Sequence, residues 1–123
     1  MSQRKEFAEY SSIIRKVLSY NEVVRGGLRL VKFSIELIDG SVLHGSEVYV
    51  TNKLEKYGYY WLDPQGGLRI GWNNAPHHLH VRTFPHHKHV GRRNHIQESS
   101  ERSLSDVLSF IEKKLKQDPS PGH

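Results

Sequence analysis

A strict alternation of apolar and polar residues over positions 31–37 constrains the fold of this chain more than any other feature. Every odd-numbered position in this stretch is apolar, and every even-numbered position is polar. A period of two is typical of a β-strand that is buried on one face. The Asp39-Gly40 pair that follows favours the positive φ angles of a tight hairpin turn. The chain is therefore expected to turn back into a second antiparallel strand over residues 41–51.

Three further segments have the composition of strands. Two of them are rich in aromatic and branched residues and are separated by residues 63–66, Asp-Pro-Gln-Gly, which suit a turn with Pro second and Gly fourth. The third is short and follows Pro85. We expect strands over residues 56–62, 68–72 and 86–90, so that the antiparallel sheet is a meander of four to five strands.

Helical spacing of apolar residues marks both ends of the chain. One amphipathic stretch covers residues 6–20, and another covers residues 103–116, where Ser103 is followed three residues later by an acid, as in a capping box. Apolar helix faces need a sheet face against which they can be buried. The sequence therefore predicts a single two-layer α+β domain over residues 1–116, with an N-terminal and a C-terminal helix flanking the sheet, and a disordered tail over residues 117–123.

Length, charge and cysteine content restrict the classes of function. The 123 residues suit one domain, and the absence of Cys excludes disulfides, thiolate metal sites and a cysteine nucleophile. No apolar run approaches the ~18 residues of a membrane span, and the start of the chain is too charged for a signal peptide. We therefore expect a cytoplasmic protein with no membrane partner. The net charge of +5 favours nucleic acid or an acidic protein as partner.

A histidine-rich segment beside four cations predicts a site that handles a polyanion. Six of the nine histidines occur in two near-copies of Pro-His-His-x-His, at Pro76–His80 and Pro85–His89. Histidine can donate or accept a proton near neutral pH and can bind a metal ion. The two prolines exclude a regular central strand between them, so residues 77–84 are expected to form a loop or a sheet edge. The cations beside the histidines are Arg82, Lys88, Arg92 and Arg93.

Three kinds of chemistry can use these residues, and the sequence leaves them open. Metal-independent RNA cleavage, which needs no cofactor, requires a base that deprotonates the 2′-hydroxyl, an acid that protonates the 5′-oxygen, and cations that stabilise the phosphorane. The residues selected for these roles are His78, His86, His87 and His89 for proton transfer and Arg82 and Lys88 for charge. The ligands of an alternative zinc or nickel site are His78, His80, His87 and His89. The third kind is a module that binds nucleic acid or an acidic protein without turnover.

Recognition of RNA would add aromatic rings and further cations to this site. Splayed bases of single-stranded RNA stack on exposed rings, and phosphates pair with basic side chains. The candidate RNA-binding residues are Tyr59 or Trp61 for stacking and Arg69, Arg92 and Arg93 for phosphates. Arg69 is a candidate because strand alternation is expected to turn it away from the apolar face of residues 68–72.

Four other residues are expected to have structural roles or no special role. Trp72 is expected in the core, because large aromatic residues on alternating strands are highly buried on average. His44 and His95 are isolated in the sequence and are expected to be ordinary surface or hydrogen-bonded histidines. Glu47 is expected to be an exposed strand glutamate rather than a general base.

Several motifs, taken in order along the chain, resemble one known family. They are Tyr59–Trp61, Trp72–His78 (Trp-Asn-Asn-Ala-Pro-His-His), Thr83–Gly91 (Thr-Phe-Pro-His-His-Lys-His-Val-Gly) and Ser103–Leu108. Over roughly residues 28–111 the chain resembles the TumE family of toxins from bacterial and archaeal toxin–antitoxin pairs. The resemblance implies a small type II toxin, a cognate helix-turn-helix antitoxin that binds DNA, and inhibition of translation through RNA cleavage. The implied substrate includes messenger RNA bound to the ribosome. Whether the protein forms a homodimer is left open by the resemblance.

Overall fold

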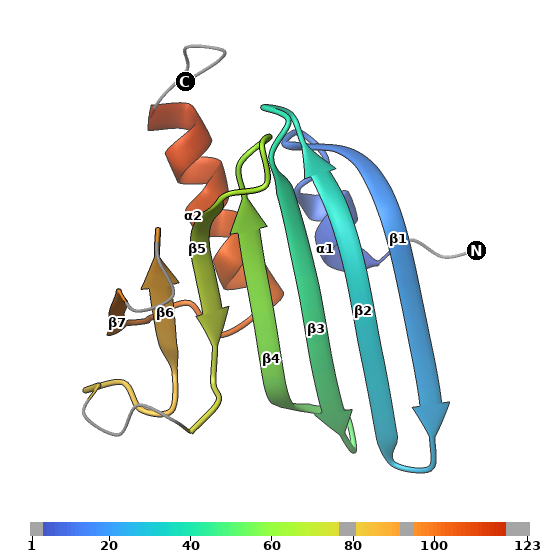
Figure 1. Cartoon of the computed structure of the whole chain (residues 1–123). Coiled ribbons are helices and arrows are strands. Elements are labelled where there is room, and N and C mark those ends of the chain that lie inside the picture. Colours follow the sequence, from blue (N-terminus) through green and yellow to red (C-terminus); the bar gives the residue numbers. More distant parts are fainter. Residues whose placement is uncertain (1–3, 77–80, 92–94, 118–123) are drawn as a thin grey trace.

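The computed structural model describes residues 4–76, 81–91 and 95–117 of the chain. Within these residues the chain forms two helices and seven strands (Figure 1). In chain order they are α1 (Lys5–Glu9), β1 (Ile14–Arg25), β2 (Leu28–Leu37), β3 (Val42–Val50), β4 (Lys53–Leu62), β5 (Leu68–Asn73), β6 (His87–Val90), β7 (Ile96–Glu98) and α2 (Leu104–Gln117). The expected α+β class is therefore confirmed. Of the expected tail over residues 117–123, Gln117 is the last residue of α2, and residues 118–123 lie outside the described residues.

The seven strands form one antiparallel sheet in which the spatial order equals the chain order. Such a meander follows from short turns, because antiparallel neighbours can be joined by a tight hairpin. The β2–β3 turn lies at Asp39-Gly40 as expected, with Gly40 at a φ of +86° and the Asp39 carboxylate accepting the backbone N–H of Ser41 at 3.1 Å. The sheet has more strands than the four to five expected, because β1 and the three-residue β7 each add one edge strand.

The N-terminal helix expected over residues 6–20 is wrong in extent, because most of that segment is β1. Helix α1 ends at Glu9, and β1 pairs with β2 from Ile14 to Arg25. The register between the two strands shifts twice near residues 14–19. These shifts interrupt the period of two and leave apolar residues at a spacing that resembles a helix.

Both helices cover the same face of the sheet, so the expected two-layer arrangement is confirmed. Figure 1 shows α1 behind β2 and its neighbours and α2 behind β4 and β5, with the opposite sheet face toward the viewer. Helix α2 begins as the sequence predicts, since the N–H of Asp106 donates to Ser103 Oγ at 3.2 Å. The N–H of Arg102 donates to the Asp106 carboxylate at 3.0 Å, which completes a box-like cap.

The hydrophobic core fills the space between the sheet and the two helices. Trp72 is fully buried there, as expected, and its Nε1–H donates to Glu101 at 3.0 Å. The other large and fully buried apolar side chains include Tyr59, Ile35, Leu37, Leu43, Leu104, Leu108 and Ile111. Burial of one such side chain stabilises a fold by roughly 1.5–3 kcal/mol. The helices therefore cover and stabilise one face of the sheet, and the opposite face is not covered by either helix.

A buried ion pair lies in this core, where an exposed glutamate was expected. Glu47 is only 1% exposed because β3 alternates and places it on the face of Leu43, which the helices cover. Arg4, the residue before α1, donates from Nη2 to Glu47 at 3.1 Å and pairs with it through Nη1 as well. The Tyr59 hydroxyl donates to the same carboxylate. The expectation of an exposed Glu47 is therefore wrong, and this carboxylate has a structural role.

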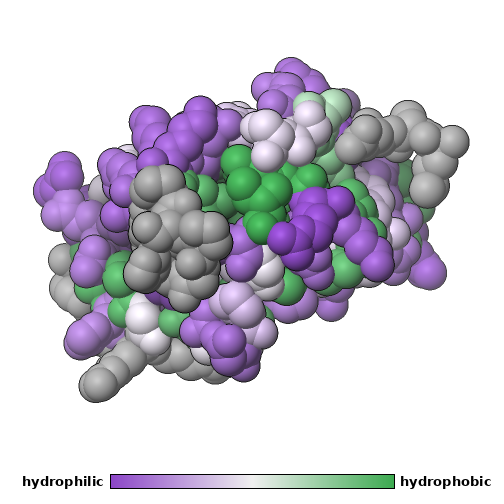
Figure 2. All heavy atoms as spheres, turned by 90° about the horizontal axis from the view of Figure 1, so that it is seen from above, coloured by the Kyte–Doolittle hydropathy of each residue, from purple (hydrophilic) through white to green (hydrophobic). Residues whose placement is uncertain are grey.

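The outer surface combines charged regions with an apolar edge. Viewed from the end of the sheet where the β2–β3 and β4–β5 turns lie, hydrophilic side chains surround a smaller hydrophobic area (Figure 2). The apolar side chains exposed on β1 and β2 are Val17, Leu18, Tyr20, Val23, Val24, Leu28 and Leu30. They lie at the opposite side of the sheet from the histidine-rich β6. In the described ranges no helix is long and apolar enough to cross a membrane.

Candidate functional site

The sheet face opposite the helices, here called the open face, carries two rows of mostly polar residues. The strand register places one residue from each of β2 to β6 in each row. The first row contains Ser34, His44, Tyr60, Gly71 and His89, and the second contains Lys32, Ser46, Gly58, Asn73 and His87. Neighbouring strands lie about 4.8 Å apart, so the rows bring histidines from β3 and β6 to one surface.

Tyr60 occupies the middle of the open face because two glycines leave room for its ring. A Cβ atom added at Gly71 would lie 2.8 Å from Cδ1 of Tyr60, and one added at Gly58 would lie 3.2 Å from Cε2. Real Cβ atoms do not approach a ring carbon as closely as the first of these distances. The ring therefore lies across the two glycine positions and leans toward β5. It remains 40% exposed, so it is accessible to a ligand.

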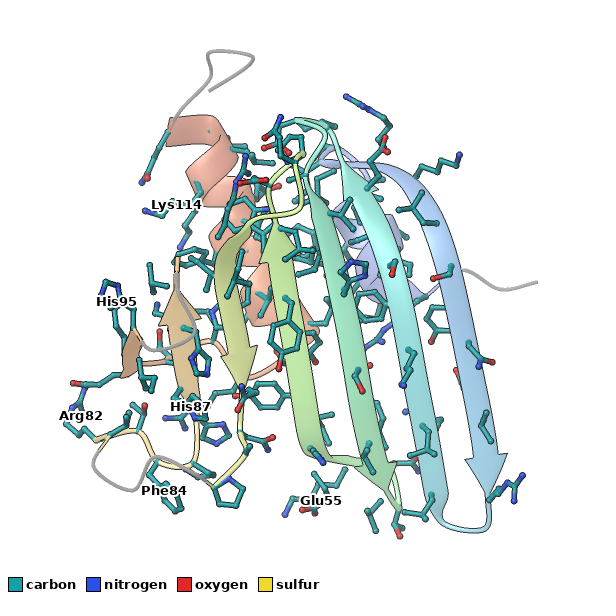
Figure 3. The ribbon with its side chains drawn as sticks, in the orientation of Figure 1. Glu55, Arg82, Phe84, His87, His95 and Lys114 are labelled. Carbon is teal, nitrogen blue, oxygen red and sulfur yellow. The ribbon has the colours of Figure 1, made fainter. Side chains whose placement is uncertain are left out.

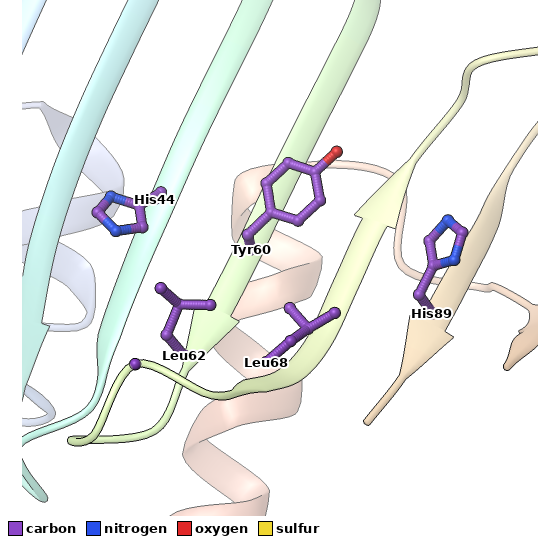
Figure 4. Close-up of a pocket in the computed structure, with 6 residues that line it drawn as sticks. His44, Tyr60, Leu62, Leu68 and His89 are labelled. Atoms are coloured by element: carbon purple, nitrogen blue, oxygen red, sulfur yellow. The ribbon is translucent and has the colours of Figure 1, made fainter. Parts of the chain in front are cut away.

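Tyr60 and His89 both line two neighbouring hollows on the open face. The leucine hollow, of about 530 Å³, is lined by His44, Tyr60, Leu62, Gly66, Leu68 and His89 (Figure 4). The lysine hollow, of about 570 Å³, is lined in part by Lys56, Gly58, Tyr60, Asn73, His87 and His89. Figure 4 shows the ring of Tyr60 between His44 and His89. Both volumes fall in the range that suits a small-molecule group such as one nucleotide.

His87 and His89 are neighbours on the open face because alternate residues of β6 share a face. Their ring centroids lie 5.1 Å apart, with the rings edge to face. His87 is only 2% exposed, and its Nδ1 lies 3.0 Å from the carbonyl oxygen of Pro85. A carbonyl oxygen only accepts hydrogen bonds, so Nδ1 of His87 carries a proton. This bond holds the His87 ring in one orientation inside the lysine hollow.

The sequence predicted no functional role for two residues of the open face, His44 and Tyr60. His44 lies beside Tyr60 in the first row, and its Nδ1 is 2.6 Å from the hydroxyl of Ser34. No local pattern links His44 to the distant histidine-rich segment. Tyr60 does have a local signal, since alternation places it on the face opposite Tyr59 and Trp61.

The expected stacking residues Tyr59 and Trp61 lie on the helix-covered face. Their exposed fractions are 0% and 5%, and Trp61 Nε1–H donates to the buried hydroxyl of Ser41 at 2.9 Å. The ring of Tyr59 stacks on that of Tyr57, with centroids 5.3 Å apart. This placement corrects the expectation that either ring stacks on an RNA base, because both are enclosed in the core.

The described histidines of the second copy, at Pro85–His89, are divided between the two faces of the sheet. Lys88 lies on the helix side, where its Nζ is 3.1 Å from Glu101 and 5.0 Å from the ring centroid of Phe110. The ring of His86 stacks on that of Tyr57, with centroids 5.8 Å apart, and its Nδ1 is 2.9 Å from the Tyr57 hydroxyl. The expected convergence of His86 and Lys88 with His87 and His89 is therefore wrong. Lys88 points to the opposite face because successive residues of β6 alternate, and His86, which precedes β6, contacts Tyr57 instead.

The environment of His86 makes the stability of the fold depend on pH. Burial lowers the pKa of His86 below its ordinary value, and the positive charge of Arg102 acts in the same direction. The neutral form is thus favoured in the folded state, so its stabilisation is complete above about pH 6.5 and is lost as the pH falls through the folded-state pKa. We expect wild-type protein to lose more unfolding free energy between pH 7 and pH 5 than His86→Gln. Urea unfolding at several pH values measures this difference, and parallel pH profiles of the two proteins would refute it.

Two of the arginines selected for the site, Arg69 for phosphates and Arg82 for transition-state charge, are paired with acids. Arg69 Nη1 lies 2.8 Å from Asp39, and its guanidinium lies 5.0 Å from the ring centroid of Trp61. A register shift after Trp61 places Leu68, rather than Arg69, on the open face, so the expected orientation of Arg69 is wrong. Arg82 lies at the outer edge of the molecule (Figure 3) and pairs with Glu98 at 2.6 Å.

Several of the predicted site residues fall outside the described ranges. They are His78, His80, Arg92 and Arg93. Across residues 4–76, 81–91 and 95–117 there is no group of three or more His, Cys, Asp or Glu side chains arranged to hold a metal ion. Of the four expected ligands, His87 and His89 are described, and they do lie on the same face.

Comparison with known proteins identifies the family of this chain. No curated protein and no solved structure gives a match. A family model described as Toxin TumE matches residues 4–115, which include every residue named above on the open face. A toxin of this kind implies an antitoxin partner. The family resemblance inferred from the sequence motifs is thus confirmed, over a longer stretch than those motifs cover, and the chain belongs to the TumE toxin family.

Proposed function

We propose that this toxin cleaves RNA without a metal ion, through groups that line the lysine hollow of the open face. One observation carries the proposal: two histidines, a lysine and two tyrosines line the same hollow. They come from β4 and β6, which the sheet topology separates by a single strand. RNA cleavage of this kind needs two groups that transfer protons and a positive charge, and these residue types supply them.

The reaction assigned to the hollow is an internal transesterification. One imidazole of the His87–His89 pair removes the proton from a 2′-hydroxyl, whose oxygen attacks the adjacent phosphorus. The bond from phosphorus to the 5′-oxygen breaks, and an acid protonates the leaving oxygen. The products are a 2′,3′-cyclic phosphate and a 5′-hydroxyl end. His89 lines both hollows, so it is the imidazole that we place against the RNA.

Positive charge is available where the phosphate would lie. Lys56 lines the lysine hollow, and Lys32 lines a third hollow on the same face together with His44 and Tyr60. The ammonium group of Lys56 can stabilise the additional negative charge of a phosphorane in the lysine hollow. Lys32, on β2, lies four strands from β6 and adds positive charge elsewhere on the same face. These two lysines replace Arg82 and Lys88 in our interpretation, since those two side chains pair with Glu98 and Glu101.

The test is cleavage of labelled single-stranded RNA in excess EDTA by protein purified without a histidine tag. We expect cleavage to persist and the products to carry 2′,3′-cyclic phosphate ends. Absence of cleavage with and without ribosomes would overturn the proposal. Loss of activity in EDTA with recovery on addition of Zn²⁺ or Ni²⁺ would favour the metal site instead. Salt-sensitive RNA binding without turnover would favour a binding module.

A further inference from the structure

We infer that the leucine hollow binds a base of the RNA, directly beside the phosphate that the lysine hollow would hold. This inference rests on the proposed function, because it names which part of the same RNA lies in which hollow. The two hollows share Tyr60 and His89 as a common wall. Residues of the first row line the leucine hollow, and residues of the second row line the lysine hollow. The two rows are two residues apart along each strand, a distance of about 6.6 Å. A base and a neighbouring phosphate of one strand can therefore occupy both hollows together.

The walls of the leucine hollow suit a flat aromatic group. Leu62 and Leu68 lie opposite each other in the β4–β5 register and supply apolar surface beside the ring of Tyr60 (Figure 4). The ring is 40% exposed, whereas Tyr59 and Trp61 on the same strand are buried. Bases of single-stranded RNA stack on exposed rings of a sheet face in several recognition modules. Tyr60 therefore takes the stacking role that was expected of its neighbours Tyr59 and Trp61.

His44 adds a polar group that can distinguish one base from another. Its Nδ1 is engaged by the Ser34 hydroxyl at 2.6 Å, which orients the ring and leaves Nε2 as the nitrogen that can meet a ligand. His44 lines the leucine hollow next to Tyr60. A hydrogen bond to a base edge discriminates between bases, whereas stacking tolerates all of them. We therefore assign affinity to Tyr60 and the two leucines, and base preference to His44.

The experiment measures binding of a short single-stranded RNA that cannot be cleaved. A 2′-fluoro oligonucleotide lacks the attacking hydroxyl, so binding is measured separately from turnover. We expect Tyr60→Ala to weaken binding about 10-fold or more, as loss of one base stack does. Tyr60→Phe keeps the ring and is expected to bind within about two-fold of wild type.

Leu68→Ser has a matched control in Leu30→Ser. Leu30 is an exposed leucine, 45% accessible, on the open face but outside both hollows. We expect Leu68→Ser to weaken RNA binding by about three- to ten-fold and Leu30→Ser to leave it unchanged. His44→Ala is expected to reduce the differences in affinity among four homopolymeric 2′-fluoro oligonucleotides. Thermal unfolding of each variant identifies any that fail to fold.

The outcomes separate this inference from the proposed cleavage. Binding that depends on Tyr60 and Leu68 in a protein that cleaves no RNA would support the base site and overturn only the catalytic proposal. Cleavage that is unaffected by Leu68→Ser, with equal binding by Leu68→Ser and Leu30→Ser, would overturn the base site and leave the catalytic proposal intact. Equal affinity of wild type and folded Tyr60→Ala would also overturn it.

Discussion

Replacement of His89 by alanine is expected to slow RNA cleavage by about 10²- to 10⁴-fold, the usual contribution of one proton-transfer group. His89 is the imidazole that lines both hollows, and its ring lies 5.1 Å from that of His87. Removal of the ring therefore removes a proton donor or acceptor at the point where the base and phosphate sites meet. The measurement is the single-turnover cleavage rate of labelled RNA in EDTA.

Two neighbouring histidines provide matched controls for this result. His95→Ala removes an exposed imidazole at the outer edge of the molecule (Figure 3), and His86→Ala removes one that stacks on Tyr57 on the helix side. His95→Ala is expected to cleave at the wild-type rate, and folded His86→Ala is expected to lose far less activity than His89→Ala. Equal rates for wild type and His89→Ala would show that the chemistry lies elsewhere.

Replacement of Arg4 by alanine is expected to lower the free energy of unfolding by about 3–5 kcal/mol, the usual cost of leaving one member of a buried ion pair without its partner. The side chain of Glu47 is 0% exposed and that of Arg4 is 11% exposed. The Tyr59 hydroxyl alone cannot replace a guanidinium that binds both carboxylate oxygens. Urea unfolding at pH 7 measures the loss.

An exposed ion pair of the same chain provides the control for Arg4. Arg15 pairs with Glu36 at 3.2 Å, and their side chains are 54% and 29% exposed. Arg15→Ala is expected to cost about 0–1 kcal/mol, because solvent screens such pairs. In the double variant, Glu47→Gln added to Arg4→Ala should recover part of the loss by removing the unpaired charge. A cost for Arg4→Ala no greater than that for Arg15→Ala would contradict the prediction.

Local patterns predicted the elements that depend on residues close together in the chain. The alternation over residues 31–37 and the turn at Asp39-Gly40 predicted the β2–β3 hairpin, and Ser103 predicted the start of α2. The same reasoning failed over residues 6–20. There two register shifts disturb the period of two, so a strand has the spacing of a helix.

The sequence by itself determined the α+β class, the core position of Trp72 and the family, because composition, periodicity and motif order are properties of the chain. Tertiary structure alone decided which residues meet at the candidate site. His44 lies in the same row as Tyr60 and His89 only because of the register of four strands. The helices pack on one face and bury Tyr59 and Trp61, so the opposite face is left to Tyr60. Strand alternation alone indicates that Tyr60 lies opposite Tyr59 and Trp61. Which face the helices cover, and which strands meet, depends on packing and pairing between distant segments, which leave no local signal.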